Sequence, residues 1–404
     1  MSIIFINRFF YPDNSATSQL LSDLAFDLAR DNFKVKIITS GNYYRTRGSC
    51  LPKRDFINGV SVFRVPTFGV DSNALISRIF QYLIFYIGAA FLLLRTIHRG
   101  DVVVFKTDPP LISAFLGPIA KIRGAYVVNW VQDIFPEVAT RLGFNLIGGL
   151  LTNLLRWVRN KSLYSAEMNV ILGSRMKDFL LAEGVPPECM SVIPNWVDGS
   201  DIYPIPPSDN RLRKDWGLST QLVIGYSGNL GRAHDFETIL NAARLLKNNP
   251  RITFLFIGGG AQMELLKKKV TEQELINFQF HSYQSRQDLR ESLNAADIHL
   301  VALNPLLEGL IVPSKIYGIL AAGRPTIFIG DPDGEISRII KLGSCGYSVS
   351  IGNSQLLAKI IEALEGDRRC SNNLGLNGRK FFESNYDRKA SYALWKNILK
   401  NYSD

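Results

Sequence analysis

The chain has 404 residues and a formal net charge of +10, with 46% hydrophobic and 20% charged residues. The length predicts about two domains, and the composition excludes a disordered chain. Four scattered cysteines and four histidines argue against a structural zinc site and fit a reduced, cytoplasmic protein. The first 195 residues hold 21 Lys and Arg against 14 Asp and Glu. This basic half favours an anionic partner, although a solvated basic surface explains it equally well.

Short apolar runs alternate with longer helical patterns along the whole chain. The strand-like runs of the first half are 2–6, 35–39, 60–65, 101–105, 125–131, 168–172 and 191–195, with a helical pattern at 16–30. The second half repeats the scheme, with runs that begin near 222, 252, 278, 298, 325 and 347. Alternating strands and helices predict a parallel, doubly wound α/β sheet in each half.

The loop after the first predicted strand, residues 7–21, contains no glycine. A dinucleotide-binding fold would carry GxGxxG there, so this loop argues against an NAD or FAD enzyme. Asn14, Ser15, Thr17 and Ser18 place small polar groups at a helix start instead. Helix capping and contact with a ligand explain them equally well.

One apolar stretch, Tyr82–Leu94, runs for thirteen residues without a charge. Because it is too short to span a bilayer, a buried helix is expected in preference to an interfacial one.

A polar segment, WVQDIFPE at 130–137, follows one of the predicted strands. It puts Gln132 and Asp133 at the carboxyl end of the strand, where open α/β sheets bind ligands. Asp133 serves either catalysis or capping, and Glu137 is the second candidate carboxylate. The sequence contains no HExxH, GxxxxGK[ST] or kinase signature and no Ser-His-Asp spacing.

Residues 193–210 carry four prolines and no helical period, which predicts an exposed linker. We therefore place an N-terminal domain at 1–197 and a C-terminal domain at 198–384, both Rossmann-like and facing a cleft. A helix at about 385–404 is expected to pack back on the first domain.

The most informative segment is IGYSGNLGRAHDF at 224–236. A strand-like run stops at Gly225, turn glycines follow at Gly228 and Gly231, and Arg232 precedes a helical pattern. Free backbone N–H groups, a helix dipole and a cation together suit an anion.

A second loop of this kind, VPSKIYGILAAGRP at 312–325, sets Ser314 and Lys315 before another helix. Two cations suit a diphosphate gripped from two sides, with Gly258 of a GGG run as a weaker third element. Ordinary turn glycines and surface cations are the alternative explanation.

These segments resemble the GT-B glycosyltransferases, specifically the large retaining family that uses nucleotide-sugar donors and builds bacterial surface polysaccharides. The resemblance runs nearly end to end and includes FFYPDNSATSQLLSDLAFDLARDNFKVKIIT, SVIPNWVD, YSGNLGRAHDFETILNAARLL, FLFIGGG and PSKIYGILAAGRPTIFIG. The most similar branch groups colanic-acid and O-antigen transferases, among them N-acetylfucosamine transferases.

The resemblance makes Arg232 and Lys315 the donor-phosphate cations, although the common pattern sets these at Asn229 and His234. The backbone that holds the base falls on Tyr283 and Gln284. The further donor-binding residues are Ser15, Thr17, Gly228, Asn229, Gly258 and Ser314.

Two features depart from the family pattern. Its pair of glutamates falls on Leu310 and Gly318, so both are missing, and Glu308 is the candidate replacement at the ribose. Its cleft histidine falls on Gln132, beside Asp133.

The implied reaction uses no metal or cofactor. The sugar–phosphate bond breaks, Arg232 and Lys315 stabilise the charge on the leaving diphosphate, and Asp133 or Gln132 orients the sugar. The resemblance implies a UDP-linked donor and a polyprenyl-diphosphate-linked sugar as acceptor, at the inner face of the cytoplasmic membrane. Apolar and basic residues at 78–99 and 146–162 are expected to contact that membrane.

Two other functions fit the same fold. A GT-B sugar-nucleotide epimerase would share the donor and need no acceptor lipid, and an inactive partner subunit would also lack the glutamates. A nucleic-acid binder is not expected, because the basic residues are scattered.

Overall fold

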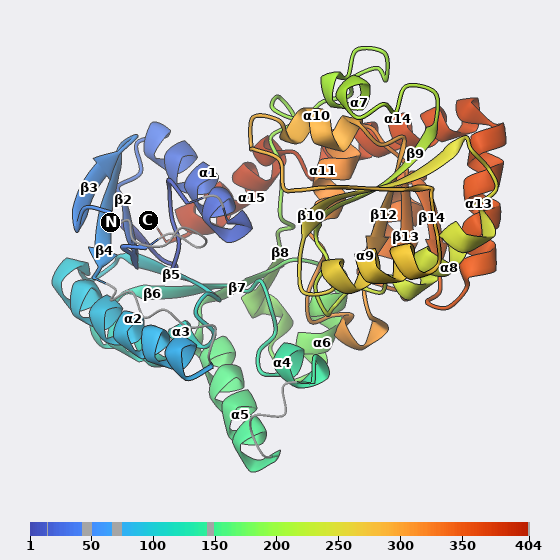
Figure 1. Ribbon diagram of the computed structural model, residues 1–404. Coiled ribbons are helices and arrows are strands. Elements are labelled where there is room, and N and C mark those ends of the chain that lie inside the picture. Colours follow the sequence, from blue (N-terminus) through green and yellow to red (C-terminus); the bar gives the residue numbers. More distant parts are fainter. Residues whose placement is uncertain (14, 43–50, 67–74, 144–148, 403–404) are drawn as a thin grey trace. The chain divides into compact units, whose positions relative to one another are not determined.

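The computed structural model describes residues 1–404 except 14, 43–50, 67–74, 144–148 and 403–404, so Asn14 and Cys50 lie outside the described residues. The chain divides into two compact α/β units (Figure 1). Unit 1 comprises Met1–Pro194 and Tyr392–Asp404, and unit 2 comprises Asn195–Ser391.

Unit 1 is built on a sheet in the order β3-β4-β2-β1-β5-β6-β7-β8. Its strands are β1 (Ile3–Ile6), β2 (Val35–Ser40), β3 (Arg54–Ile57), β4 (Val60–Val65), β5 (Val102–Lys106), β6 (Tyr126–Trp130), β7 (Met168–Ile171) and β8 (Met190–Val192). All neighbours are parallel except β3, an antiparallel edge strand that the sequence pattern did not predict. Because β1 pairs with both β2 and β5, the strand order reverses between β1 and β5, where such sheets bind ligands.

Helices cover both faces of this sheet (Figure 1). On one face α2 (Leu75–Thr96) and α3 (Ile112–Ile122) bury Phe85, Leu93 and Leu116 in one apolar cluster with β1 and β5. The other face carries α1 (Ala16–Arg30) and α15 (Arg388–Lys400), the end of the chain. Trp395 of α15 packs on Trp130, with ring centroids 4.8 Å apart. The remaining helices are α4 (Glu137–Arg141), α5 (Gly149–Ser165), α6 (Ser174–Ala182) and the 3-10 turn η1 (Pro187–Cys189).

Helix α2 differs from the prediction for Tyr82–Leu94. It has 22 residues, and by length and composition alone its segment Ile79–Thr96 could cross a membrane. Only 17% of that segment is buried. The prediction of a buried helix is therefore wrong for one face: Phe85, Ala89 and Leu93 pack inward, whereas Ile87 and Phe91 lie in solvent.

Unit 2 is an all-parallel sheet in the order β11-β10-β9-β12-β13-β14. Its strands are β9 (Leu222–Asn229), β10 (Ile252–Gly259), β11 (Phe278–His281), β12 (Ile298–Ala302), β13 (Thr326–Ile329) and β14 (Gly346–Val349). In chain order this is 3-2-1-4-5-6, the arrangement of a Rossmann fold. The switch point falls between β9 and β12, which pair through Ile224 and Gly225.

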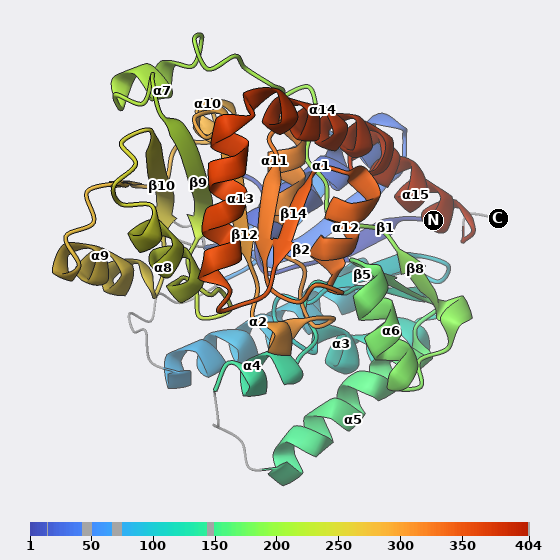
Figure 2. The same ribbon diagram turned by 90° about the vertical axis from the view of Figure 1, so that its right-hand side faces the viewer.

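The strands of unit 2 are buried on both faces. Leu222, Ile224 and Tyr226 of β9 join the main core with α8 (Glu237–Leu245), α9 (Met263–Glu272) and α13 (Ser354–Gly366). Val223 packs instead in a smaller cluster with Leu218, as side-chain alternation along a strand requires. Figure 2 looks onto α13 and its neighbours. The other helices are α7 (Arg211–Asp215), α10 (Leu289–Asn294), the 3-10 turn η2 (Pro305–Leu307), α11 (Lys315–Ala321), α12 (Glu335–Gly343) and α14 (Arg368–Asn385).

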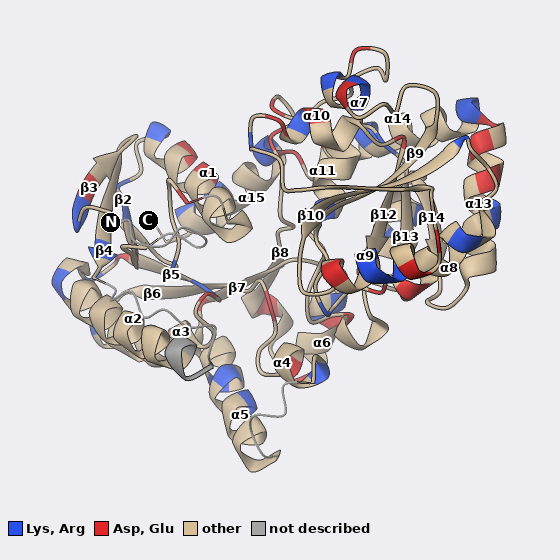
Figure 3. Cartoon of the chain, in the orientation of Figure 1, with Lys and Arg blue, Asp and Glu red and all other residues tan. Residues whose placement is uncertain are grey.

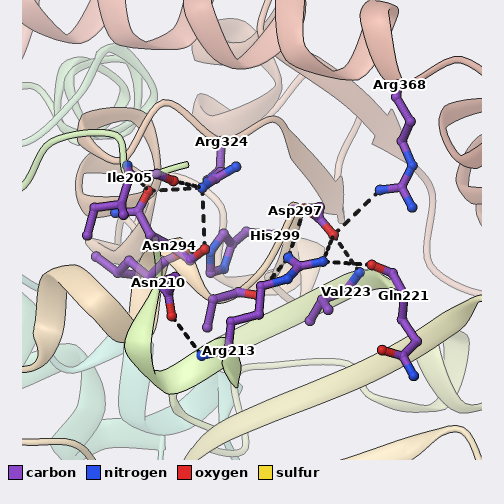
Figure 4. A network of polar contacts seen from close by, with 12 residues as sticks. Ile205, Asn210, Arg213, Gln221, Val223, Asn294, Asp297, His299, Arg324 and Arg368 are labelled. Carbon is purple, nitrogen blue, oxygen red and sulfur yellow. Dashed lines mark hydrogen bonds and ion pairs between the residues drawn. The ribbon is translucent and has the colours of Figure 1, made fainter. Parts of the chain in front are cut away.

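The proline-rich segment after β8 is attached to unit 2 by side chains that bind its backbone. Arg379 donates to the carbonyls of Ile202 (2.8 Å) and Gly199 (3.2 Å), and Arg324 donates to that of Ile205 (2.6 Å; Figure 4). Asn294 accepts from the Ile205 N–H at 2.8 Å. The prediction of a linker misses this attachment, because the binding residues come from distant helices and loops.

A charged network joins the start of β9 to the residues just before β12 (Figure 4). Arg213 grips Asp297 with both terminal nitrogens, at 2.9 and 3.0 Å. Asp297 also accepts from the Val223 N–H at 2.8 Å and pairs with Arg368 at 3.5 Å. The network lies at the amino ends of these strands, opposite the loops at their carboxyl ends.

Candidate functional site

Strand β9 continues through Gly225 to Asn229, so the predicted stop at Gly225 is wrong. Gly228 and Asn229 pair with Gly258 and Gly259 of β10. A Cβ on Gly258 would lie 2.2 Å from the Gly228 carbonyl oxygen, and both glycines have positive φ, +110° and +135°. Glycine is required here because no side chain fits between these two strand ends.

The turn that follows, residues 230–234, is held in place by its neighbours. The Gln262 side chain donates to the carbonyls of Gly231 (2.7 Å) and His234 (3.0 Å). The Asn304 N–H, just after β12, donates to the Ala233 carbonyl at 2.8 Å. The exposed Arg232 therefore projects from a fixed turn beside the switch point.

Lys315 is the first residue of α11, and its side chain reaches the end of β9. The Nζ atom lies 3.7 Å from the ring centroid of Tyr226 and 4.0 Å from where a Cβ of Gly228 would stand. It is buried and has no hydrogen-bond partner within the described part of the chain. This burial lowers the pKa of Lys315 to about 7. An amine in this state lacks a counter-anion.

His234 lies in the same turn as Arg232 and has a defined protonation state. Its Nδ1 is 2.6 Å from the Ala302 carbonyl oxygen, which can only accept, so Nδ1 carries the hydrogen. Burial, with a further contribution from Lys315, lowers the pKa of His234 to about 4. The ring is thus neutral at pH 7, and Nε2 remains available as an acceptor.

Among the other predicted donor-binding residues, Tyr283 lies at the carboxyl end of β10, and Gln284 and Glu308 form hydrogen bonds within the fold. The Tyr283 ring packs on Gly259, where an added Cβ would be 3.1 Å from Cε2. Gln284 donates to the Ser282 carbonyl at 2.9 Å, and Ser314 is exposed at the start of α11. Glu308 accepts from the Glu335 N–H at 2.6 Å and so caps α12.

Unit 1 has a recess at the carboxyl ends of β5 and β6, with a cavity of about 40 Å³. Lys106, Thr107 and Asp133 line it together with apolar side chains of α3. The space suffices for a few water molecules. It therefore offers a small, mostly apolar subsite with a few polar groups next to the switch point of this sheet.

Asp133 lies on this recess with an accessible but poorly hydrated carboxylate. Its surface is exposed, yet surrounding protein atoms displace much of the water that would solvate its charge. Burial and the like charge of Asp108 raise the pKa of Asp133 to about 6, and Lys106 opposes the rise. Asp133 can change its protonation state near neutral pH, as acid–base and positioning groups do.

The remaining candidates of unit 1 have mostly structural contacts. Gln132 is buried, and its N–H donates to Thr107 Oγ1 at 3.0 Å. Glu137 is paired with Arg156 (2.9 Å) and Arg159 (2.7 Å), so this runner-up carboxylate is bound within the fold. Ser15 and Thr17 begin α1, and Ser15 Oγ makes no capping hydrogen bond.

Sequence reasoning missed Lys106 and selected His234 only as a pattern position. A charged residue closing the apolar run VVVF was the available signal for Lys106, and its burial could not be foreseen. Among the described residues no group of three or more His, Cys, Asp or Glu side chains could hold a metal ion.

Comparison with known proteins gives one family match and several similar folds. Residues 208–381 match the family model described as glycosyl transferases group 1. In the solved structures, sucrose-phosphate synthase from Thermosynechococcus elongatus aligns with a TM-score of 0.77 at 16% identity, covering 99% of each chain. HepE of Anabaena, solved in complex with UDP, aligns with a TM-score of 0.72 at 16% identity, covering 99% of this chain and all of HepE. The protein thus has the GT-B fold, as predicted, and residues 208–381 of unit 2 are similar to the group 1 glycosyl transferases.

Two relatives have a higher sequence identity to this chain than these two solved structures. WbjE of Pseudomonas aeruginosa, named as a glycosyltransferase, is 29% identical over 73% of each chain. WcaI of Escherichia coli (strain K12), assigned to colanic acid biosynthesis as a glycosyl transferase, is 24% identical over 84% of this chain and 86% of its own. These matches confirm the predicted resemblance to GT-B glycosyltransferases of surface-polysaccharide synthesis.

Proposed function

We propose that the protein is a retaining glycosyltransferase of bacterial surface-polysaccharide synthesis. It takes a hexosyl or N-acetylhexosaminyl group from a UDP-sugar and passes it to a polyprenyl-diphosphate-linked sugar. The names of WbjE and WcaI and the UDP bound to HepE support this choice of pathway and donor.

One observation carries the proposal: the buried, unpartnered amine of Lys315 beside the backbone contact of Gly228 and Gly258. Burying an amine without an acceptor is unfavourable, so a ligand anion is its natural partner. The neighbouring switch point of β9 and β12 is where a Rossmann-like sheet binds nucleotides. Arg232, on its fixed turn, supplies a second cation for a diphosphate.

The chemistry follows from the charge that develops on the diphosphate. The bond between the sugar C1 and the phosphate oxygen breaks, and the acceptor hydroxyl oxygen forms a bond to C1 on the same face. The hydroxyl proton passes to the departing diphosphate, whose charge Arg232 and Lys315 stabilise. Asp133 and Gln132 orient the reacting sugar, and no metal takes part.

The experiment is calorimetric titration of the whole chain with UDP, GDP and ADP, followed by turnover of the matching nucleotide sugars. We expect UDP to bind and Lys315→Met to weaken it at least tenfold, as losing a charge-assisted contact does. Lys341→Met is the control, because Lys341 is an exposed lysine of α12 in the same unit. Isomerisation of a UDP-sugar without acceptor would establish an epimerase instead, and no nucleotide binding would leave an inactive subunit.

The acceptor part of the proposal rests on exposed apolar side chains of unit 1. We define a docking face by exposed side chains of three adjacent helices: Phe80, Leu83, Ile87 and Phe91 of α2, Phe115 and Ile122 of α3, and Leu150, Leu154 and Trp157 of α5. The three helices contact one another, since the rings of Tyr86 of α2 and Phe115 of α3 lie 5.2 Å apart and the hydroxyls of Ser113 of α3 and Ser162 of α5 lie 2.9 Å apart. Residues 146–148 of the predicted membrane segment lie outside the described residues.

Basic side chains accompany this face. Arg95 stacks on Phe91 at 3.9 Å and Lys161 on Trp157 at 5.0 Å, and Figure 3 shows Lys and Arg along α5. Apolar side chains mixed with cations suit the interface of an anionic bilayer, where each Lys or Arg contributes about 1 kcal/mol. Because α2 buries Phe85 and Leu93 in the core of unit 1, we propose that it lies on the membrane and does not cross it.

Vesicle flotation tests the docking face. We expect the protein to float with vesicles of phosphatidylglycerol and phosphatidylcholine and much less with phosphatidylcholine alone. Ile87→Glu should abolish flotation, whereas Ile276→Glu should not, because Ile276 lies in unit 2 and is even more exposed than Ile87 (89% against 72%). Flotation of Ile87→Glu at the wild-type level would refute the docking face and leave the donor site untouched.

A further inference from the structure

A lysine is buried at the switch point of unit 1, outside the chemistry proposed above. Lys106 is the last residue of β5 and is 1% exposed. Its Nζ donates to the Thr17 carbonyl at 2.9 Å and lies 3.8 Å from the ring centroid of Trp130. Burying a lysine amine costs free energy unless specific partners compensate it, so the buried position of Lys106 needs a physical explanation.

Burial lowers the pKa of Lys106 well below its ordinary value, and nearby carboxylates oppose this effect. Asp108 after β5, Asp133 after β6 and Asp23 of α1 each raise the pKa of Lys106 through their negative charge. Burial raises the pKa of Asp108, the charge of Arg8 after β1 lowers it, and the charge of Asp13 raises it further. Lys106 and Arg8 are therefore the cations, and Asp13, Asp23, Asp108 and Asp133 the carboxylates, of one group of charges that influence one another.

Lys106 also connects two predicted parts of the site. It lines the recess on which Asp133 lies. Through the Thr17 carbonyl it holds the first turn of α1, which carries Ser15 and Thr17. Lys106 thus contacts the backbone of one predicted element and shares a recess with the carboxylate of another.

We propose that Lys106 is a positioning residue of the glycosyl-transfer site, which fixes the first turn of α1 and supplies positive charge to the recess on which Asp133 lies. The inference rests on the proposed function, in which Asp133 works as a carboxylate. A purely structural lysine, placed only to cover Trp130, would leave the ionisation of Asp133 unaffected when replaced.

Three substitutions separate the hydrogen bond of Lys106 to the Thr17 carbonyl from the effect of its charge. Lys106→Gln can still donate to the Thr17 carbonyl but carries no charge, Lys106→Met can do neither, and Lys106→Arg keeps a charge. Lys36→Met is the matched control, because Lys36 also donates to a carbonyl, that of Thr96 at 2.7 Å, and approaches one carboxylate, Asp101 at 3.9 Å. It lies in β2, near the amino end of the sheet, away from the recess.

The readout is the pKa of Asp133, measured by carbon NMR on the whole chain labelled at the aspartate carboxyl carbon and assigned by the signal lost in Asp133→Asn. Removing a neighbouring opposite charge shifts a carboxyl pKa by about 1–3 units. We expect Lys106→Gln and Lys106→Met to raise the pKa of Asp133 by at least about one unit, and Lys106→Arg and Lys36→Met to leave it near the wild-type value.

The outcomes are distinguishable. An unmoved Asp133 pKa in Lys106→Gln would overturn the role given to Lys106, and this variant suffices if Lys106→Met does not fold. Calorimetry with UDP on the same samples reports on unit 2. Lack of UDP binding by the wild type would overturn the proposed donor site, whatever the NMR shows. With an active acceptor, the acid limb of kcat/KM should move to higher pH in Lys106→Gln and return in Lys106→Arg.

Discussion

Binding of UDP should draw a proton onto Lys315, and the size of this uptake follows from the structure. Burial lowers the pKa of the free amine to about 7, and a bound diphosphate should restore it toward the ordinary value near 10. The bound state then holds more protons than the free state. Uptake should be about 0.5 proton at pH 7 and about 0.9 at pH 8, and UDP affinity should fall about tenfold from pH 8 to pH 9.

The assay is isothermal titration with UDP in buffers of different ionisation enthalpy at pH 7, 8 and 9. The slope of the observed enthalpy against that of the buffer gives the number of protons taken up. UDP itself contributes little, because its last phosphate ionisation has a pKa near 6 and can release at most about 0.1 proton at pH 7 and less at higher pH. His234 does not interfere either, because its pKa of about 4 keeps it neutral throughout.

Lys315→Arg is the decisive variant. A guanidinium stays charged across this range, so it should bind UDP with no proton uptake and no pH dependence of affinity. Tight UDP binding to the wild type with no proton uptake at pH 8 would refute the predicted protonation of Lys315. It would mean that the Lys315 amine is already charged without ligand or does not contact the diphosphate.

Three further predictions concern Arg232, Asp133 and Asp297. Arg232→Ala should lower kcat/KM for the nucleotide sugar by roughly ten- to a hundredfold, the effect of losing one charge-assisted contact, while Arg244→Ala on the exposed face of α8 should leave it unchanged. Wild-type activity should fall as pH drops below about 6, where Asp133 becomes protonated, and a pH–rate profile of Asp133→Asn should be slower and lack this limb. Asp297→Ala should lower the free energy of unfolding in urea by about 3–5 kcal/mol, because it leaves the buried Arg213 without its ion-pair partner. The affinity for UDP should be unchanged, since this network lies at the opposite end of the strands from the proposed donor site.

Local patterns account for what could be foreseen in the fold. The alternation of apolar runs and helical periods predicted two parallel α/β units, because a strand buried on both faces and a helix with one apolar face differ in periodicity. The glycines at 228 and 258 could also be singled out, since few residues tolerate a positive φ at a strand end. The exact end of β9 was missed, because pairing with β10 is what extends the strand to Asn229.

Distances between segments far apart in the sequence decided the rest. The sequence located Lys315 and Gly228 in separate loops, and only the strand order β10-β9-β12 brings Nζ over Tyr226. Lys106 is an ordinary basic residue in the sequence, and it becomes a buried cation only because α1 and Trp130 close over it. Likewise α2 is apolar on all sides, so its composition could not tell which face the core of unit 1 covers and which face stays exposed. Periodicity and turn chemistry are local properties and can be recognised along the chain, whereas burial and charge environment depend on neighbours that tertiary packing supplies.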